Sequence, residues 1–465
     1  MRKEYEDMKK KIILFIALTV LVVAGMALLA SYVFSGGKYD NISWEYRNDV
    51  LTIKGEGDMP DFYYECPLDK YAEKAKELVI EEGITSVTGD TFYGFNKLEK
   101  ITLPDSVNKI GDSAFDCCIS LKEVDFGEGV VSIGRNAFEF CIELESVKLP
   151  ESLESLGCVS FSCCEKLKTV HMGSKLKEIG WSAFDDCHED IRFFLNEENP
   201  FLVCEDGVFF SEDKKTLLYY CNVKKNETYT IPEGIVKIAP YAFLNSENLK
   251  KVDFPQSIQI IDEMAFCNNS NLHIVTIPDS VTEIGKGAFG GCINLERVYI
   301  GKGVSSELES VFVLSACISE ISVSEENMHF SSVDGVLFNK DKTKLIMYPA
   351  AKGGVVYEVP STVNEIGRGA FSNSNFLGVI LPDNLVSVGE SAFSNSTIEE
   401  INIPASVTSL GENAFRDCES LKKIIYEGTM SEWKKNFSDS YYDSRTANHT
   451  VICSDGEINV ETDDE

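Results

Sequence analysis

The sequence is short of basic residues, of histidine and of every compact motif that marks a common catalytic site. Lysine and arginine number 43 against 75 aspartates and glutamates, which gives a formal net charge of −32. So acidic a surface repels nucleic acids and anionic lipid headgroups. The chain contains no G-x-S-x-G, H-E-x-x-H or Walker A motif, and its five histidines are scattered. We therefore expect no nucleic-acid binding, no enzyme activity, no cofactor and no small-molecule substrate.

Two weaker patterns also fail as site signatures. Gly285, Gly287 and Gly290 match the dinucleotide-binding pattern G-x-G-x-x-G, but no strand–helix–strand unit surrounds them. The 15 cysteines include no C-x-x-C pair and no cysteine–histidine cluster with zinc-like spacing. These patterns give no reason to expect a bound nucleotide or metal ion.

A repeat of 22 or 23 residues runs through most of the chain. In each copy an Ile-Gly pair is followed by an Ala-Phe pair, a small residue and apolar residues at fixed offsets. The repeat phenylalanines are Phe92, Phe115, Phe138, Phe161, Phe184, Phe243, Phe266, Phe289, Phe312, Phe371, Phe393 and Phe415. A fixed period of this size predicts stacked units, each of which buries its apolar face against its neighbours.

Each unit is predicted to contain a short strand, a turn and a short helical turn. Val124 and Phe126 alternate with Glu123 and Asp125, which is the period of a strand with one buried face. A Pro-Asp-Ser-Val segment such as residues 104–107 predicts a chain reversal, because proline fixes φ and Asp or Ser bonds the local backbone. Eight units place glycine four residues before the phenylalanine, which suits a tight corner before a helical turn.

These residues resemble the BspA-like branch of the leucine-rich repeat family. The motif I-G-x-x-A-F-x-x-C-x-x-L-x-x-V-x-L-P-x-S-V is met almost whole at residues 110–126, 133–153 and 284–300. The resemblance implies an α/β repeat solenoid, a right-handed superhelix whose strands form one continuous curved sheet. We expect about 12 units of 22–23 residues, two inserted β-hairpins, and caps around Trp44 and Trp433. The family is defined by its scaffold, so the resemblance says less about the ligand.

The N-terminus carries a long uncharged stretch. Residues 12–34 form an uninterrupted run of 23 uncharged residues, long enough to span a bilayer as a helix. Residues 1–11 are net positive and should stay in the cytoplasm. We predict a single-pass membrane protein, with this signal anchor and an extracellular repeat domain. The alternative is a secreted protein, cleaved after Ala27 or Ala30.

Two segments that look alike, around Asp206-Gly207 and Asp334-Gly335, interrupt the period and predict the hairpins. The organisation we predict has a cytoplasmic tail (1–11), a transmembrane anchor (12–34), a flexible linker with an N-terminal β cap and partial repeat (35–85), repeat block 1 (86–200), a hairpin insert (201–229), repeat block 2 (230–328), a hairpin insert (329–356), repeat block 3 (357–428), and a C-terminal cap with a frayed acidic tail (429–465).

The position of the cysteines suggests buried thiols. An extracellular location would favour disulfides. However, six cysteines lie three residues after a repeat phenylalanine, in a slot filled elsewhere by serine or asparagine. They are Cys118, Cys141, Cys164, Cys187, Cys292 and Cys418. Free cysteine behaves as a compact hydrophobe, so we predict that these residues are buried free thiols, with disulfides as the alternative.

A partner would bind most naturally to the outward positions of the strands, on the concave face. The candidate ligand-binding residues are Lys100, Asp125, Lys148, His171, Phe194, Asp253, Arg297 and Tyr299. Exposed aromatic side chains among mixed charges suit a protein or glycan partner, although a plain solvated sheet could carry the same residues. Characterised members of the family include bacterial surface proteins that bind matrix proteins or cells. We predict a non-catalytic cell-surface binding or adhesion module; the alternative is a structural envelope scaffold or spacer with no specific ligand.

Overall fold

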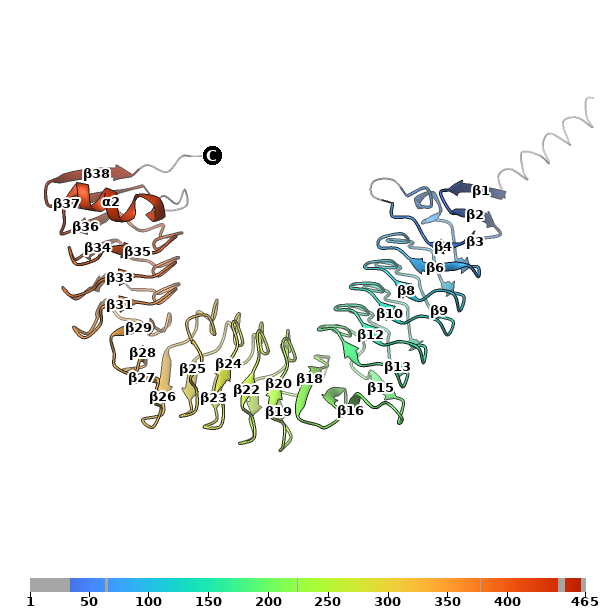
Figure 1. Ribbon diagram of the computed structural model, residues 1–465, viewed down its shortest axis with the longest axis horizontal. Helices are drawn as coiled ribbons and strands as arrows, with labels where there is room; N and C mark the ends of the chain where they lie inside the picture. The colour runs from blue at the N-terminus through green and yellow to red at the C-terminus, as the bar shows by residue number, and fades with distance from the viewer. Residues whose placement is uncertain (1–33, 63–65, 224, 377, 442–447, 461–465) are drawn as a thin grey trace, which may run out of the picture. The chain divides into compact units, whose positions relative to one another are not determined.

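The computed structural model describes residues 34–62, 66–223, 225–376, 378–441 and 448–460. The chain divides into two compact units, residues 1–206 and 207–465, and each is taken by itself. Within each unit, successive turns of the chain stack as a repeat solenoid (Figure 1).

Each turn contributes one strand to a series of parallel pairs that we call the long ladder. In the first unit these strands are β3 (Val50–Gly55), β5 (Glu77–Ile80), β7 (Lys100–Thr102), β9 (Glu123–Asp125), β11 (Ser146–Lys148), β13 (Thr169–Met172) and β15 (Arg192–Leu195). In the second they are β19 (Thr228–Thr230), β21 (Lys251–Asp253), β23 (Ile274–Ile277), β25 (Arg297–Ile300), β26 (Glu320–Val323), β30 (Val356–Glu358), β32 (Gly378–Ile380), β34 (Glu400–Ile403), β36 (Lys423–Tyr426) and β37 (His449–Cys453). The described residues thus form about 17 turns, and our count of about 12 was wrong.

A second series of strands, the short ladder, follows the proline turn. In the first unit it consists of β4 (Gly57–Asp58), β6 (Ile84–Val87), β8 (Lys109–Ile110), β10 (Ser132–Ile133), β12 (Ser155–Leu156) and β14 (Glu178–Ile179). The second unit adds β20 (Lys237–Ile238), β22 (Ile260–Ile261), β24 (Glu283–Ile284), β31 (Glu365–Ile366), β33 (Ser387–Val388) and β35 (Ser409–Leu410). The strands are distributed over several separate sheets, and the single continuous sheet that we expected is not formed.

The segment that carries the repeat phenylalanine, which we call the Phe turn, is a tight double turn and not a helix. Around Phe115, both Ser113 (φ 52°) and Cys117 (φ 60°) are left-handed, and this pattern recurs in most Phe turns. A left-handed residue on each side of the phenylalanine prevents a helix. The backbone N–H groups of Ser113, Phe115 and Cys117 instead donate to carbonyls of the next turn, each over 2.8 Å. The predicted helical turn, and with it the α/β class, was wrong.

Helix is therefore scarce in the described part of the chain. It is confined there to the 3-10 turn η1 (Asp69–Tyr71) and to α2 (Met430–Tyr441) in the C-terminal cap. The solenoid is built from strands and turns, and its stability comes from contacts between turns.

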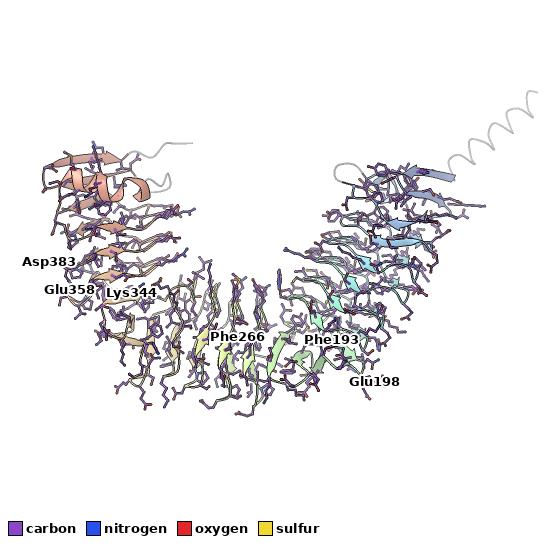
Figure 2. The ribbon with its side chains drawn as sticks, in the orientation of Figure 1. Phe193, Glu198, Phe266, Lys344, Glu358 and Asp383 are labelled. Atoms are coloured by element: carbon purple, nitrogen blue, oxygen red, sulfur yellow. The ribbon has the colours of Figure 1, made fainter. Side chains whose placement is uncertain are left out.

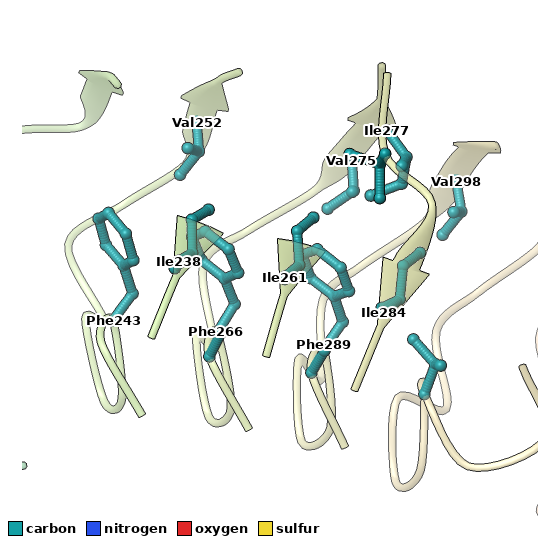
Figure 3. Close-up of a cluster of buried hydrophobic side chains, with 14 of the residues drawn as sticks. Ile238, Phe243, Val252, Ile261, Phe266, Val275, Ile277, Ile284, Phe289 and Val298 are labelled. Carbon is teal, nitrogen blue, oxygen red and sulfur yellow. The ribbon is translucent and has the colours of Figure 1, made fainter. Parts of the chain in front are cut away.

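Stacked phenylalanines form the centre of the core. Phe243, Phe266 and Phe289 lie ring on ring, with centroids 4.6 and 5.2 Å apart (Figure 3). Isoleucines of the short ladder, such as Ile261, and valines of the long ladder, such as Val275, pack around them (Figure 3). Burial of these rings supplies the main stabilisation of each turn.

The repeat glycine is required because stacked backbones approach closely. A Cβ atom at Gly157 would lie 2.4 Å from the carbonyl carbon of Gly134, and one at Gly180 would lie 2.2 Å from the nitrogen of Cys158. No side chain fits at such distances. Glycine is thus needed for contact with the preceding turn, and not for the tight corner that we predicted.

The proline turn also connects neighbouring turns of the solenoid. Ser106 Oγ donates to the carbonyl of Ile84 over 2.7 Å, one turn earlier. Asp105 Oδ1 accepts from the N–H of Glu128 over 2.8 Å, one turn later. The serine and the acid thus bond adjacent turns, whereas we had assigned them to the local backbone.

The two inserted segments are built into the solenoid. The antiparallel pair β17 (Val208–Ser211) and β18 (Thr216–Tyr220) joins the short ladder, because β18 pairs with β20 in parallel. The second insert has three antiparallel strands, β27 (Phe330–Val333), β28 (Val336–Asn339) and β29 (Lys344–Met347), and β29 pairs with β31 in parallel. In the phenylalanine stack, Tyr220 lies against Phe243 at 4.9 Å and Tyr348 lies against Phe371 at 5.4 Å.

Antiparallel strands cover the first turn of the solenoid. β1 (Phe34–Tyr39) pairs with β2 (Ile42–Arg47), which pairs with β3. Asn48 and Asp49 are both left-handed, as a two-residue hairpin requires. Ser35-Gly36-Gly37, which we expected to be a flexible linker, lies within β1, and a Cβ atom at Gly37 would lie 2.4 Å from the Trp44 ring. β16 (Leu202–Glu205) is the last strand of the first unit.

The predicted membrane anchor, residues 12–34, lies outside the described residues apart from Phe34, which begins β1. Among the described residues, no helix has the length and apolarity needed to cross a bilayer. The predicted tail at 1–11 likewise lies outside the described residues.

The C-terminal cap closes the last turn with aromatic side chains. Trp433 and Phe437 of α2 are buried against Tyr426, with ring centroids 5.4 and 5.6 Å from the Tyr426 ring. Thr429 begins the helix with a capping box, because its N–H donates to Glu432 and its hydroxyl accepts from the N–H of Glu432. β38 (Gly456–Val460) pairs with β37, so the predicted frayed tail is a strand up to residue 460.

Candidate functional site

Outward side chains of the long ladder form rows, because its parallel strands pair in register. In the first unit Lys148 pairs with His171, and His171 pairs with Phe194. In the second unit Thr276 pairs with Tyr299. The candidate residues therefore fall into two sets, one in each unit.

The first set is centred on an exposed pair of rings. The rings of His171 and Phe194 stack with centroids 4.8 Å apart and planes 16° apart. Phe194 is 48% exposed, an unusual fraction for a phenylalanine in a folded chain. Lys148 lies beside His171 and is also exposed. We call Lys148, His171 and Phe194 the His–Phe platform.

Polar groups surround this platform. An open hollow of about 640 Å³ is lined by the platform together with Glu151, Asn196 and other residues, among them Glu198, which is labelled on the surface in Figure 2. Glu151 accepts hydrogen bonds from the N–H of Ser174 over 2.7 Å and from Asn196 Nδ2 over 3.3 Å. The Ser174 N–H holds the pKa of Glu151 below its usual value. The platform is thus bordered by a fixed negative charge.

Two predicted residues of the first unit lie on the strands that precede the platform. Lys100 Nζ forms an ion pair with Glu123 Oε1 over 2.8 Å, and the hydrogen bond and charge of Glu123 raise the pKa of Lys100. Asp125 lies opposite Thr102 on the neighbouring strand, and its Oδ1 accepts from the N–H of Gly127. Asp125 is thus on the strand next to that of Lys148, two strands from His171, and Lys100 is one strand further away.

The predicted residues of the second unit lie on two turns, with one turn between them. Asp253 forms an ion pair with Lys251 over 2.7 Å and lines a hollow of about 590 Å³ with Ile274. Tyr299 lies two turns further on and is 37% exposed. Arg297 precedes it by two residues on β25 and points outward in the adjacent row. These side chains form a looser set than the platform.

The cysteine slot is structural. Cys118, Cys141, Cys164, Cys292 and Cys418 are buried free thiols, which confirms the prediction for these five. Each thiol donates to the carbonyl of the preceding repeat phenylalanine, over 3.0 to 3.5 Å. Cys187 is also buried and makes the same bond to Phe161 over 3.2 Å. Ser315 and Asn269 fill the slot elsewhere and make the same bond over 2.8 Å.

Burial also makes these thiols unreactive. It raises the pKa of Cys292 to about 12, so this thiol stays protonated at neutral pH. Across the described ranges, no group of three His, Cys, Asp or Glu side chains is placed to hold a metal ion. The slot therefore offers neither a nucleophile nor a metal ligand.

Sequence reasoning missed three features that the geometry makes plain. It overlooked the left-handed residues of the Phe turn, the role of Glu151 beside the platform, and a cavity next to Phe312. The first could have been suspected from the asparagines and glycines that recur two residues before or after the phenylalanine. The cavity has no sequence signal, because it depends on how the second insert meets the array.

The family model for the BspA type leucine rich repeat region matches six copies, at residues 70–189, 214–341 and 356–454. These ranges cover well over half of the chain. The chain belongs to the BspA-type leucine-rich repeat family. BspA-type repeat proteins are generally non-catalytic and typically lie at the cell surface or outside the cell. No curated protein matches the sequence.

A solved leucine-rich repeat structure shows the same fold, and two others are similar to this chain in sequence. A leucine-rich repeat protein from Eubacterium ventriosum is 20% identical, and the alignment covers 84% of this chain and 96% of that chain with a TM-score of 0.58. One from Bacteroides ovatus is 21% identical, with 89% and 99% covered and a TM-score of 0.43. A leucine rich cell surface protein from Faecalibacterium prausnitzii is 20% identical, with 88% and 99% covered and a TM-score of 0.37.

Proposed function

We propose that this BspA-type protein is a non-catalytic binding or adhesion module of the cell surface. Its partner is a protein or a glycan, and the outward face of the long ladder carries the contact. The anchor at residues 12–34, or secretion after cleavage, would place the repeats outside the cell. The observation that carries the proposal is the His–Phe platform.

The platform has the composition of a binding hot spot. Its two stacked rings offer a flat, rigid apolar surface at little cost in side-chain entropy. Lys148 and Glu151, which line the same hollow, supply charges of opposite sign for polar contacts at the rim. An aromatic centre with a polar border is typical of surfaces that bind proteins, and stacked rings also accept the apolar face of a sugar.

The test is a binding screen of residues 34–465 against matrix proteins, mucins and glycans. Phe194→Ala should weaken saturable binding by tenfold or more, since hot-spot truncations cost about 2 kcal/mol or more. Tyr299→Ala tests the second unit in the same way. Ile380→Ala is the matched control, because Ile380 is a 53% exposed apolar residue on the long-ladder strand β32 and belongs to neither set.

Two results would argue against this function. If Phe194→Ala and Ile380→Ala weaken binding equally, the platform is not part of the contact. Failure of the folded protein to bind any of the three ligand classes would favour the alternative, an envelope scaffold or spacer.

A further inference from the structure

The hydrogen bonds between Phe turns are interrupted after Phe312. In the Phe turns of Phe92, Phe115, Phe138, Phe161, Phe243, Phe266, Phe289, Phe371 and Phe393, three backbone N–H groups donate to the next turn. The equivalent N–H groups of Ser310, Phe312 and Leu314 make no hydrogen bond within the described part of the chain. The second insert follows this turn, and its strands do not continue the pattern.

On the other side of the same interruption, backbone carbonyls lack the hydrogen bonds that they would accept from a regular preceding turn. In the Phe turn of Phe371, the Ala370 carbonyl accepts from the N–H of Tyr348 over 2.7 Å. The carbonyls of Arg368 and Ser372, whose equivalents in other turns accept from the preceding turn, receive no hydrogen bond from the described residues. Open donors and open acceptors therefore belong to two successive Phe turns of one unit.

A cavity of about 230 Å³ lies between these two turns. Both sets of open backbone groups belong to residues that line it, and Phe312, Ile346, Met347 and Ala350 give it an apolar wall. Leu314 lies at the cavity and is 73% exposed. Unpaired backbone groups beside an apolar cavity are costly unless a ligand or water satisfies them.

Charged residues at the cavity are mostly paired. Lys344, labelled in Figure 2, lies 2.6 Å from both Glu309 and Glu365. Arg368 forms an ion pair with Glu390 over 2.7 Å. Lys286 is exposed at the cavity and forms no ion pair with a described residue. Lys344 neutralises only one of its two glutamates, so the extra carboxylate offsets Lys286 and the charges around the cavity balance. A ligand of this cavity therefore needs no net charge.

We propose that this cavity binds a peptide segment of a partner protein, which takes the place of the missing Phe turn. A peptide backbone carries both carbonyls and N–H groups, so one segment can satisfy the donors of Phe312 and Leu314 and the acceptors of Arg368 and Ser372. An anion would satisfy the donors alone. Backbone pairing supplies affinity in this mode, and an apolar side chain in the cavity supplies selectivity. The site is separate from the His–Phe platform and does not depend on it.

The probe for the test is the capped peptide acetyl-Gly-Ala-Phe-Gly-Gly-amide. It copies residues 287–291, a Phe turn whose two left-handed positions are both glycine, Gly287 (φ 63°) and Gly291 (φ 67°). A short peptide reaches this conformation without the strain that other residues would add. Titration calorimetry on the full chain should show saturable binding, and hydrogen exchange in residues 308–316 should slow.

Ala350→Leu fills the cavity and should weaken binding of the peptide at least tenfold. Ala351→Leu is the matched control, because Ala351 is exposed and does not line the cavity, and it should leave binding unchanged. Val313→Trp, at a 47% exposed residue that lines the cavity, is a second blocking variant if Ala350→Leu does not fold.

Three outcomes would overturn the proposal. The first is the absence of saturable binding to the folded full chain. The second is equal binding by the wild type and both blocking variants. The third is a combination of two results: inorganic phosphate slows hydrogen exchange in residues 308–316, and a peptide methylated at its backbone nitrogens binds as tightly as the unmethylated one. The site would then recognise hydrogen-bond acceptors only.

Discussion

The Phe turns of Phe266 and Phe312 occupy equivalent positions in their repeats but have different surroundings. Phe266 stacks on both sides, 4.6 Å from Phe243 and 5.2 Å from Phe289. Within the described part of the chain, Phe312 stacks on Phe289 alone, at 5.9 Å, and its turn makes no forward hydrogen bonds. The comparison teaches that a turn of this solenoid is completed by its neighbours, so a repeat at an interruption is less constrained than one within a block.

The largest expected effect comes from removing the two rings. Phe266→Ala should lower the free energy of unfolding by about 4 kcal/mol, as for other buried phenylalanines. Phe312→Ala should cost about 1–2 kcal/mol less, because that ring already borders a cavity. Urea unfolding of the two variants measures the difference, and equal losses would show that the interruption does not weaken the turn.

A smaller loss of stability is expected from substitution of Gly285, the repeat glycine in the turn of Phe289. A Cβ atom at Gly285 would lie 2.3 Å from the nitrogen of Glu263, so Gly285→Ala should destabilise by about 1–3 kcal/mol. At Gly378 the added carbon would meet only Val356 Cγ2, at 3.8 Å. Gly378→Ala is therefore the control and should leave the melting temperature unchanged or raised. A harmless Gly285→Ala would contradict the close contact between backbones.

Alkaline pH should destabilise the wild type, which has a buried thiol at Cys292, more than the variant Cys292→Ser. Burial raises the pKa of Cys292 from 9.0 to about 12, so the folded state holds this proton more tightly than the unfolded state. The resulting stability is present below pH 9 and declines as the pH rises towards 12. Cys292→Ser removes this titration, so between pH 8 and pH 10 the wild type should lose about 1 kcal/mol more of its free energy of unfolding than the variant does. A pH-independent difference would contradict the burial.

The smallest effect compares two slot serines. Ser315 Oγ donates to the Phe289 carbonyl over 2.8 Å, so Ser315→Ala should cost about 1 kcal/mol. Ser374 fills the same slot directly after the second insert, where its buried hydroxyl has no hydrogen-bond partner among the described residues. Ser374→Ala should therefore be neutral or slightly stabilising. Thermal melts of both variants test this contrast, which fails if Ser374→Ala is the more damaging change.

The sequence was enough to predict the solenoid, the repeat phenylalanines and both caps, because burial repeats with the period. It was insufficient for the Phe turn, since Phe140 and Val159 are left-handed although neither residue type favours that conformation. The number of turns was underestimated because strands such as β3, β26 and β37 occur in turns that lack the full motif. Contacts with neighbouring turns decide these cases, and local propensity does not record them.

The candidate site was predictable to a similar degree. Counting outward strand positions was enough to place His171 next to Phe194. It could not foresee that Glu123 pairs with Lys100, or that Lys251 pairs with Asp253, because side-chain reach decides those pairs. The cavity beside Phe312 lies where the hydrogen bonds between Phe turns stop, and the sequence pattern does not show where they stop.

The one-way hydrogen bonds of the Phe turns also bear on how such a gene can change in length. Every regular turn offers donors to the turn after it and acceptors to the turn before it, as Phe115 does between Phe92 and Phe138. Duplication or loss of one whole repeat of 23 codons would therefore join matching surfaces and leave no polar group unpaired. A change of another length has to be absorbed in the turns between strands, as it is in the 22-residue repeats and at the two inserts, or it would misalign both ladders. Whole repeats are therefore the unit by which the array lengthens or shortens most readily.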